Sequence, residues 1–169
     1  MTLPDLEEHE EENNNPHQHS VTEALIEVIK LAAEEGRITL GVHECIKLLG
    51  SSAEEVMLCL IAKWTGSQDA AVKIEHVLIK AFCQEGYIDL LHVHDQVKLT
   101  KLLVTCLSQS AQDKPQNVIK PPMEENSAGY SCIMIKYPKH DTSPDEDMVA
   151  EYIKHEQMTH AEPFVALPD

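Results

Sequence analysis

Between two apolar segments in the first third of the chain, the sequence reads Gly41-Val42-His43-Glu44-Cys45-Ile46-Lys47. The residues just before it, Ile38-Thr39-Leu40, are apolar or β-branched, which is typical of a short strand. From Val42 to Leu49 apolar side chains recur at helical spacing, and Gly50 follows as a stop signal. The stretch therefore predicts a strand that turns at a glycine directly into a helix.

Helical and strand-like segments alternate on both sides of this unit. Upstream, Ser20-Val21-Thr22-Glu23 has the form of a capping box, which predicts a helix that ends at Gly36. Downstream, Val56 to Ile61 is continuously apolar, the pattern of a strand buried on both faces. The other expected elements are a helix capped by Asp69 and ended by Gly86, a strand at 88–93, a helix capped by Asp95 and running to 107, a strand at 130–137, a helix at 145–155 and a strand at 164–167. This alternation predicts an α/β fold with three layers, α/β/α, in a single domain.

The acidic charge is concentrated at the two ends of the chain. The sequence holds 29 acidic and 13 basic residues, a net charge of −16. Residues 1–20 carry six acids and no Lys or Arg, whereas residues 21–110 are nearly balanced. We predict a disordered acidic tail at 1–19, a domain at 20–169, and a mobile loop at 108–129, which is polar and contains three prolines.

Composition also excludes several classes of function. So large an acidic excess repels nucleic acid at long range, and no apolar run approaches the roughly 20 residues that span a bilayer. The first 20 residues lack the pattern of a secretory signal. The five cysteines lie inside apolar runs without C-x-x-C spacing, which favours buried reduced thiols in an intracellular protein.

No pattern in the sequence indicates catalysis, a cofactor or a metal site. Phosphate-binding glycine motifs, G-x-S-x-G and H-E-x-x-H are all absent. His92 and His94 alternate on an expected strand and could start a zinc site, but spacing suggests no third ligand. We expect both histidines to face solvent at a strand end, and we expect no enzyme.

The helix expected after residue 69 carries more apolar surface than one sheet can cover. Ile74, Val77, Leu78, Ala81 and Phe82 form one stripe, and a weaker stripe of Val72, His76, Ile79 and Cys83 lies on another face. Such width indicates either a deeply packed helix or a protein–protein interface. We take Ile74, Val77, Leu78 and Ala81 as the candidate dimer interface, and Lys63, Trp64, Asp69, Glu124 and Glu125 as candidate partner-binding loop residues.

The opening heptapeptide resembles the Gly-x-Asn-Glu-x-x-Lys signature of kink-turn-binding ribosomal proteins. Gly41, Glu44 and Lys47 match, but His43 stands where those proteins use Asn to read RNA. A kink-turn RNA-binding protein is therefore the alternative hypothesis. With His43 in place of Asn and a charge of −16, RNA is not the expected partner.

Three blocks of sequence resemble the growth-arrest and DNA-damage-inducible (Gadd) family more closely. They are residues 39–49, 55–62 and 78–83, and agreement resumes at 131–135 and 163–168. That family is similar in fold to the kink-turn proteins, so the resemblance implies an α/β/α sandwich around a mixed β-sheet. It also implies a non-enzymatic stress sensor of nucleus and cytoplasm that forms a homodimer through its helical face.

The same resemblance implies a set of protein partners. Family members bind and activate a MAP kinase kinase kinase, and contact the replication sliding clamp and cyclin-dependent kinase complexes. In better-known members the loop corresponding to residues 63–69 is strongly acidic, but here it contains one acid, Asp69. The kinase-activating role is therefore the function we expect.

Overall fold

A five-stranded mixed sheet forms the middle layer of the computed structural model, which describes residues 16–62, 70–111, 131–159 and 163–167. The strand order is β1-β4-β2-β3-β5. Strand β4 pairs antiparallel with β1 and β2, whereas β2 pairs parallel with β3, and β3 parallel with β5. The expected α/β/α sandwich around a mixed sheet is confirmed.

The elements follow one another in the expected alternation. In chain order they are α1 (Pro16–Glu34), β1 (Ile38–Leu40), α2 (Val42–Ser52), the 3-10 turn η1 (Ala53–Glu55), β2 (Val56–Ala62), α3 (Ala70–Glu85), β3 (Asp89–Val93), α4 (Gln96–Ala111), β4 (Cys132–Lys136), α5 (Pro144–Thr159) and β5 (Phe164–Val165). Within the described ranges, no helix combines the length and the apolarity that crossing a membrane requires.

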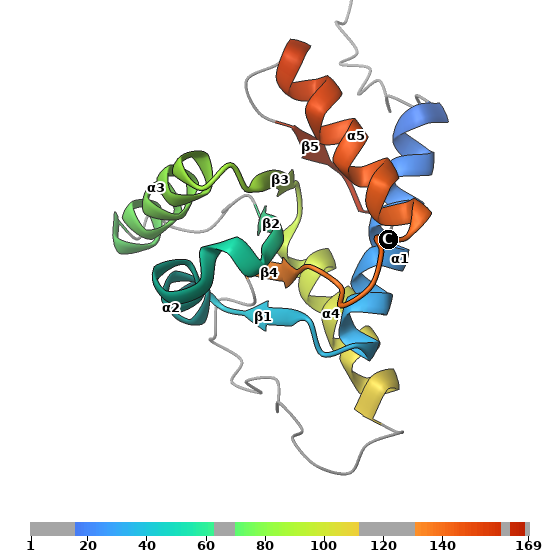
Figure 1. Cartoon of the computed structure of the whole chain (residues 1–169), viewed down its shortest axis with the longest axis horizontal. Coiled ribbons are helices and arrows are strands. Elements are labelled where there is room, and N and C mark those ends of the chain that lie inside the picture. Colours follow the sequence, from blue (N-terminus) through green and yellow to red (C-terminus); the bar gives the residue numbers. More distant parts are fainter. Residues whose placement is uncertain (1–15, 63–69, 112–130, 160–162, 168–169) are drawn as a thin grey trace, which may run out of the picture.

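Helices cover both faces of the sheet (Figure 1). Helices α1, α4 and α5 pack on one face, where the larger core cluster includes Leu25, Leu103 and Ile153. Helices α2 and α3 pack on the other face over a second cluster that includes Cys45 and Ile79. Both sheet faces are therefore buried, which explains why the central strands read as continuous apolar runs.

Strand β2 divides its side chains between the two clusters. Leu58, Leu60 and Ala62 face the α1 side, and Cys59 and Ile61 face the α2 side. The pairing of β2 with β4 shifts register between Val56 and Leu58. Because of this bulge, Val56 lies on the α2 side although strict alternation would place it with Leu58.

The first helix begins earlier than the sequence pattern indicated. Helix α1 starts at Pro16, and proline is favoured at the first helical position because it has no N–H to leave unpaired. The expected capping box at Ser20 is wrong, since Ser20 lies inside the helix and its hydroxyl donates to Met148 Sδ at 3.5 Å. Residues 1–15 of the expected tail lie outside the described ranges.

Three helices also extend past their expected ends, and one of them is α5, which ends at Thr159 rather than at residue 155. Helix α2 continues through Gly50 to Ser52, so Gly50 is not a stop. Helix α4, capped as expected by Asp95 at 2.8 Å from the Val97 amide, continues to Ala111. In its last turns Ser108 donates to the Val104 carbonyl at 2.7 Å, which satisfies the hydroxyl inside the helix. Residues 108–111 are therefore helical rather than part of the loop.

Helix α5 begins with a capping box that we did not predict from the sequence. The Ser143 hydroxyl accepts from the Glu146 amide at 3.2 Å, and Glu146 Oε2 accepts from the Ser143 amide at 2.8 Å. The signal was present in the sequence as Ser143-Pro144-Asp145-Glu146. The same Glu146 also receives Arg37 Nη2 at 2.8 Å, so the start of α5 is tied to the turn before β1.

Candidate protein-interaction surface

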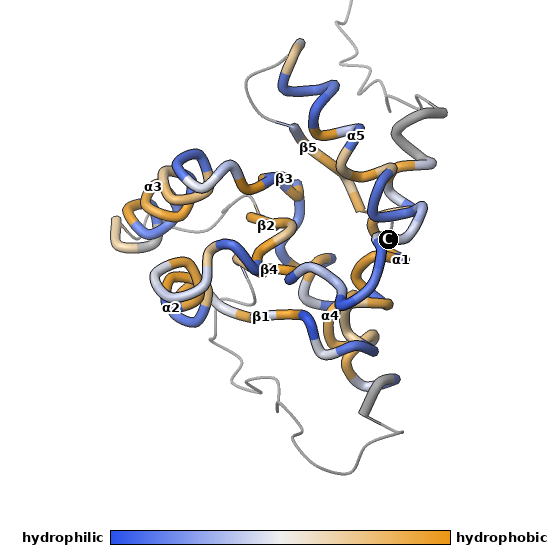
Figure 2. Tube along the Cα trace, in the orientation of Figure 1, coloured by the Kyte–Doolittle hydropathy of each residue, from blue (hydrophilic) through white to orange (hydrophobic). Residues whose placement is uncertain are grey.

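Helix α3 presents a row of apolar side chains to solvent. The exposed fraction is 67% for Ile74, 65% for Val77, 43% for Leu78 and 37% for Phe82. Ala81 is exposed as well. Figure 2 shows hydrophobic segments on successive turns of this helix. We call these five residues the α3 face; they include the four that the sequence indicated as a dimer interface.

The second stripe of α3 is the one that holds the helix on the sheet. Ile79 and Cys83 are fully buried against the α2-side cluster, and His76 is half-buried beside Ser131, with Nε2 and Oγ 3.3 Å apart. Burial lowers the pKa of His76, with Lys80 adding to the effect. The stripe that looked weaker in the sequence therefore forms the core contact, which leaves the α3 face uncovered in the described chain.

An exposed aromatic residue, Tyr87, lies just past the C-terminal end of α3. Tyr87 is 96% exposed and has a positive φ of 53°, a left-handed conformation rare for residues other than glycine. The Ile88 amide donates to the Cys83 carbonyl at 2.9 Å, which is the closing bond of a Schellman motif at the C-terminus of α3. The sequence indicated Gly86 as the end signal, but the left-handed residue is Tyr87.

Much of the exposed apolar surface of the described residues lies on α3 and on Tyr87. Nine large hydrophobic side chains are exposed in the described residues, and five of them belong to α3 or to Tyr87. Contiguous apolar surface of this kind marks protein–protein contacts, with aromatic residues as frequent anchors. The arrangement can bind an apolar surface of a partner.

The candidate loop residues cannot be placed in the same way. Lys63, Trp64, Asp69, Glu124 and Glu125 all lie outside the described residues. Their assignment to partner binding, and that of Asp69 as the α3 cap, remains a prediction.

The heptapeptide that resembles the RNA-binding signature, residues 41–47, lies at the junction of β1 and α2. Gly41 has a φ of 87° and turns the chain into α2, as expected. His43 is exposed, and Lys47 pairs with Glu44 at 3.1 Å on the surface of the same helix. The two charged residues among the three shared with the RNA-binding signature thus neutralise each other, which leaves no local positive charge from this pair for a phosphate backbone.

The expectation that both strand-end histidines face solvent is wrong for His92. Strand β5 adds to the outer side of β3, and Phe164 packs between the two histidines, with ring centroids 5.0 Å from His92 and 5.1 Å from His94. His92 is buried as a result, whereas His94 is exposed. Among the described residues, no three His, Cys, Asp or Glu side chains gather in a way suited to a metal ion.

The cysteines are buried and reduced, as the sequence indicated. Four of them, Cys45, Cys59, Cys83 and Cys132, lie in the cluster between the sheet and α2 and α3. The Cys45 thiol donates to the backbone carbonyls of Thr39, at 3.7 Å, and of Cys132, at 3.9 Å. The neighbouring thiols of Cys45 and Cys59 lower the pKa of Cys132. The neighbouring Cys132 thiol, together with burial, raises the pKa of Cys45 and Cys59.

The family model and the most similar known proteins point to the same family. The model of the ribosomal protein L7Ae/L30e/S12e/Gadd45 family matches residues 23–117. The chain is 37% identical over 105 residues to growth arrest and DNA damage-inducible protein GADD45 alpha of Bos taurus, covering 62% of each chain. It is 36% identical to the Homo sapiens protein of that name, again over 62% of each chain. It is 32% identical to GADD45 gamma of Rattus norvegicus over 72% of this chain and 68% of that one.

The chain therefore spans somewhat less than two thirds of the length of the alpha relatives. Among solved structures, a protein with unknown function from Bacillus halodurans C superimposes with a TM-score of 0.45 at 12% identity, covering 81% of this chain and 98% of that one.

Proposed function

Because the chain belongs to the ribosomal protein L7Ae/L30e/S12e/Gadd45 family, we propose that it is a non-enzymatic adaptor of the stress response. In this proposal it binds and activates a MAP kinase kinase kinase and acts as a homo-oligomer. Its relatives are named for growth arrest and DNA damage. We propose corresponding roles for this chain in DNA-damage signalling and cell-cycle control, in nucleus and cytoplasm.

The observation that carries the proposal is the uncovered α3 face. Ile74 and Val77 are each about two thirds exposed on a helix that buries Ile79 and Cys83 on its other side. Exposed apolar surface costs solvation free energy, which burial against a partner recovers at roughly 25 cal/mol per Å². This supports a protein whose task is binding, and we assign the α3 face to self-association.

The acidic charge suits the proposed kinase partner. A net charge of −16 produces a negative potential that accelerates encounter with a basic surface. An adaptor activates a kinase when it binds the active form more tightly than the autoinhibited form. We propose that this chain does so by engaging the regulatory segment of the kinase, so that the segment no longer covers the catalytic domain.

A kinase-activation assay with two forms of the enzyme tests the proposal. We expect the purified chain to bind and activate a MAP kinase kinase kinase that carries its regulatory segment, and to have no effect on the same kinase without the segment. Absence of binding to the intact kinase contradicts the proposal. Equal activation of both forms contradicts the part assigned to the regulatory segment.

Further partners follow from the same family resemblance. We propose the replication sliding clamp and cyclin-dependent kinase complexes as additional binders, which pull-down from stressed-cell lysate with mass spectrometry can identify. The alternative function, kink-turn RNA binding, is tested by a gel shift at low salt. We expect no shift, because the protein is strongly acidic and Lys47 is paired with Glu44.

A further inference from the structure

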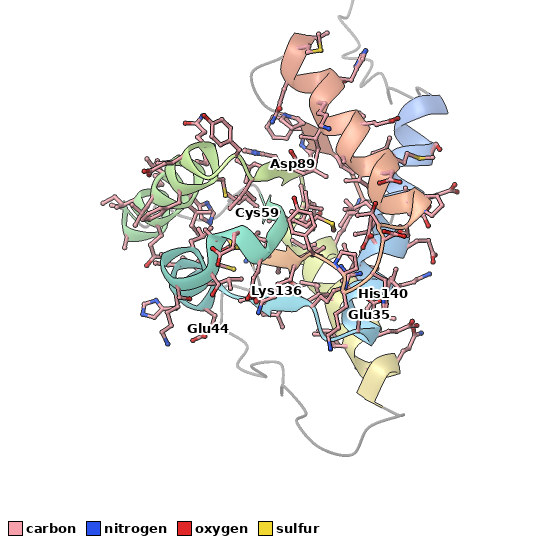
Figure 3. The ribbon with its side chains drawn as sticks, viewed as in Figure 1. Glu35, Glu44, Cys59, Asp89, Lys136 and His140 are labelled. Carbon is pink, nitrogen blue, oxygen red and sulfur yellow. The ribbon has the colours of Figure 1, made fainter. Side chains whose placement is uncertain are left out.

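A small pocket lies between α5 and the beginning of β3, in the helical layer on the opposite side of the sheet from α3. Its volume is about 160 Å³. The floor is apolar, formed by Val28, Leu58, Val149 and Ile153. Asp89, labelled in Figure 3, lines the pocket from the first residue of β3.

The Asp89 carboxylate is placed unusually for an acid. It is half-buried, and within the described residues no hydrogen bond or ion pair shorter than 4 Å is formed by its side chain. Burial raises the pKa of Asp89, and the more distant charge of Lys154 offsets this only in part. A half-buried carboxylate without a direct partner is a group that a cation can satisfy.

The neighbouring ionisable groups on the pocket wall are already engaged or exposed. Glu146 is buried in its pair with Arg37, and the Asp147 carboxylate accepts from Thr142 at 2.7 Å. Lys154 is exposed, and the Tyr137 side chain is more than half exposed. Asp89 is therefore the carboxylate of the pocket lining that is available to bind a cation. It lies above an apolar floor, which favours contact with a hydrocarbon chain.

We propose that this pocket binds an alkylammonium group, with the ammonium on Asp89 and an aliphatic stem of about four carbons over the apolar floor. The size agrees, since a cavity of about 150 Å³ holds a benzene molecule, which has six heavy atoms, and n-butylammonium is slightly smaller. Two sources supply this chemistry: a free aliphatic amine, or the side chain of a lysine on a partner protein.

The test is a titration of the full chain with n-butylammonium, followed by amide chemical shifts in two-dimensional NMR. We expect saturable shifts at the pocket residues, and at least tenfold weaker binding of n-butanol, which has the same stem without the charge. Asp89→Asn should weaken n-butylammonium binding at least tenfold. The matched control, Glu54→Gln, removes an exposed carboxylate that does not line the pocket and should leave binding unchanged.

A second variant keeps the proposal testable independently of charge. Ala150→Leu adds side-chain volume on the pocket wall and should abolish binding while the remaining amide spectrum stays that of the folded protein. Absence of saturable binding overturns the proposal, as does equal affinity for n-butanol or undiminished affinity in Asp89→Asn.

Two further arms identify the source of the amine and the charge that holds it. Competition by a blocked Ala-Lys-Ala peptide, but not by blocked Ala-Ala-Ala, indicates a lysine of a partner protein; binding of n-butylammonium alone indicates a small amine. Because Glu146, Asp147, Lys154 and Tyr137 are the other ionisable groups facing the pocket, the Asp147→Asn variant is titrated in parallel. We expect affinity to fall as pH decreases through the pKa of Asp89, in wild type and in Asp147→Asn alike.

Discussion

Two helices of this protein end on the same backbone motif with different residues at its left-handed position. At the end of α1 the residue is Gly36, with a φ of 69°, and the Arg37 amide donates to the Ala32 carbonyl at 2.8 Å. At the end of α3 it is Tyr87. Glycine adopts this conformation without steric cost, whereas a residue with a Cβ pays about 1 kcal/mol or more.

Replacing Tyr87 by glycine should therefore stabilise the protein. We expect Tyr87→Gly to raise the free energy of unfolding by about 1 kcal/mol, because the ring is almost fully exposed and contributes little packing. Urea denaturation measures the change. Tyr87→Ala is the control, since it removes the ring and keeps the Cβ, and should leave stability nearly unchanged. A loss of stability in Tyr87→Gly contradicts the account by showing that the ring makes stabilising contacts.

The buried ion pair between Arg37 and Glu146 joins residues 109 positions apart. We expect Glu146→Gln to destabilise the fold by about 3 kcal/mol, because the buried Arg37 guanidinium loses the buried counter-charge at Nη2 and keeps only the exposed Glu35 carboxylate at Nε. Thermal or urea unfolding measures this. Glu44→Gln, which removes an acid from an exposed pair, is the matched control and should cost less than about 0.5 kcal/mol. Comparable costs for the two variants would show that burial of the first pair has no energetic consequence.

Asp89 makes stability depend on pH. Burial raises the pKa of its carboxyl in the folded protein, so the native state holds the proton more tightly than the unfolded state does. The ionised group therefore destabilises the fold above its folded pKa, and the penalty disappears as pH falls to the unfolded value of about 3.9. We expect Asp89→Asn to be more stable than wild type at pH 7, by less than about 1 kcal/mol because the group is half exposed.

Unfolding curves at pH 7 and near pH 3 measure this difference. The two proteins should converge at the lower pH, where the Asp89 of wild type is protonated in both states. A difference that stays constant between the two pH values would mean that the carboxyl charge is not its cause.

Helix α3 divides its apolar residues most clearly between a packed side and an exposed side. Its inner stripe, represented by Ile79 and Cys83, is buried, and its outer α3 face is apolar but exposed. Most surface helices of a sandwich present a polar outer face. The α3 face therefore contributes little to the packing of the described chain, and we propose that self-association gives it a role.

Leu78→Glu tests this assignment. We expect the variant to stay folded and to be a monomer by light scattering, whereas wild type is larger, because an unpaired carboxylate buried in an interface costs several kcal/mol. Val97→Glu is the matched control: Val97 is an exposed apolar residue on α4, and its replacement should leave the oligomeric state unchanged. An unfolded Leu78→Glu would show that Leu78 belongs to the core, and an unchanged oligomer would place self-association elsewhere.

At the scale of the whole molecule, charge is separated from packing. Residues 1–20 contain six acidic residues and no Lys or Arg. The two buried apolar clusters lie in the described helices and strands. Such a segment affects solubility and the rate of association with basic partners more than the fold itself.

We expect deletion of residues 1–15 to shift the melting temperature by less than about 2 °C, the effect of a change well below 1 kcal/mol in a domain of this size. Deletion of 1–19 also removes the first turn of α1 and should cost more. Calorimetry measures both. Binding of the 1–15 deletion to the kinase should slow in association at low salt, with dissociation unchanged. A markedly lower melting temperature or faster dissociation would show that residues 1–15 pack on the domain or contact the partner.

Local chemistry determined much of this structure from the sequence by itself. The apolar run of β2, the helix cap at Asp95 and the helix end at Gly36 are all as predicted, because each depends on residues that are neighbours in the chain. The Ser143-Glu146 capping box is local too and could have been predicted. The apolar residues that form the α3 face were likewise recognisable from their spacing alone.

The tertiary structure decided what depends on distant segments. Both stripes of α3 are apolar, so only the position of the sheet and of α2 selects Ile79 for the core and leaves Ile74 in solvent. His92 is buried because β5, some seventy residues later, adds beside β3. The pair of Arg37 with Glu146 and the pocket at Asp89 arise from contacts between elements that periodicity does not relate. A sequence pattern records which side chains can be buried, but burial itself is set by which segments meet in space.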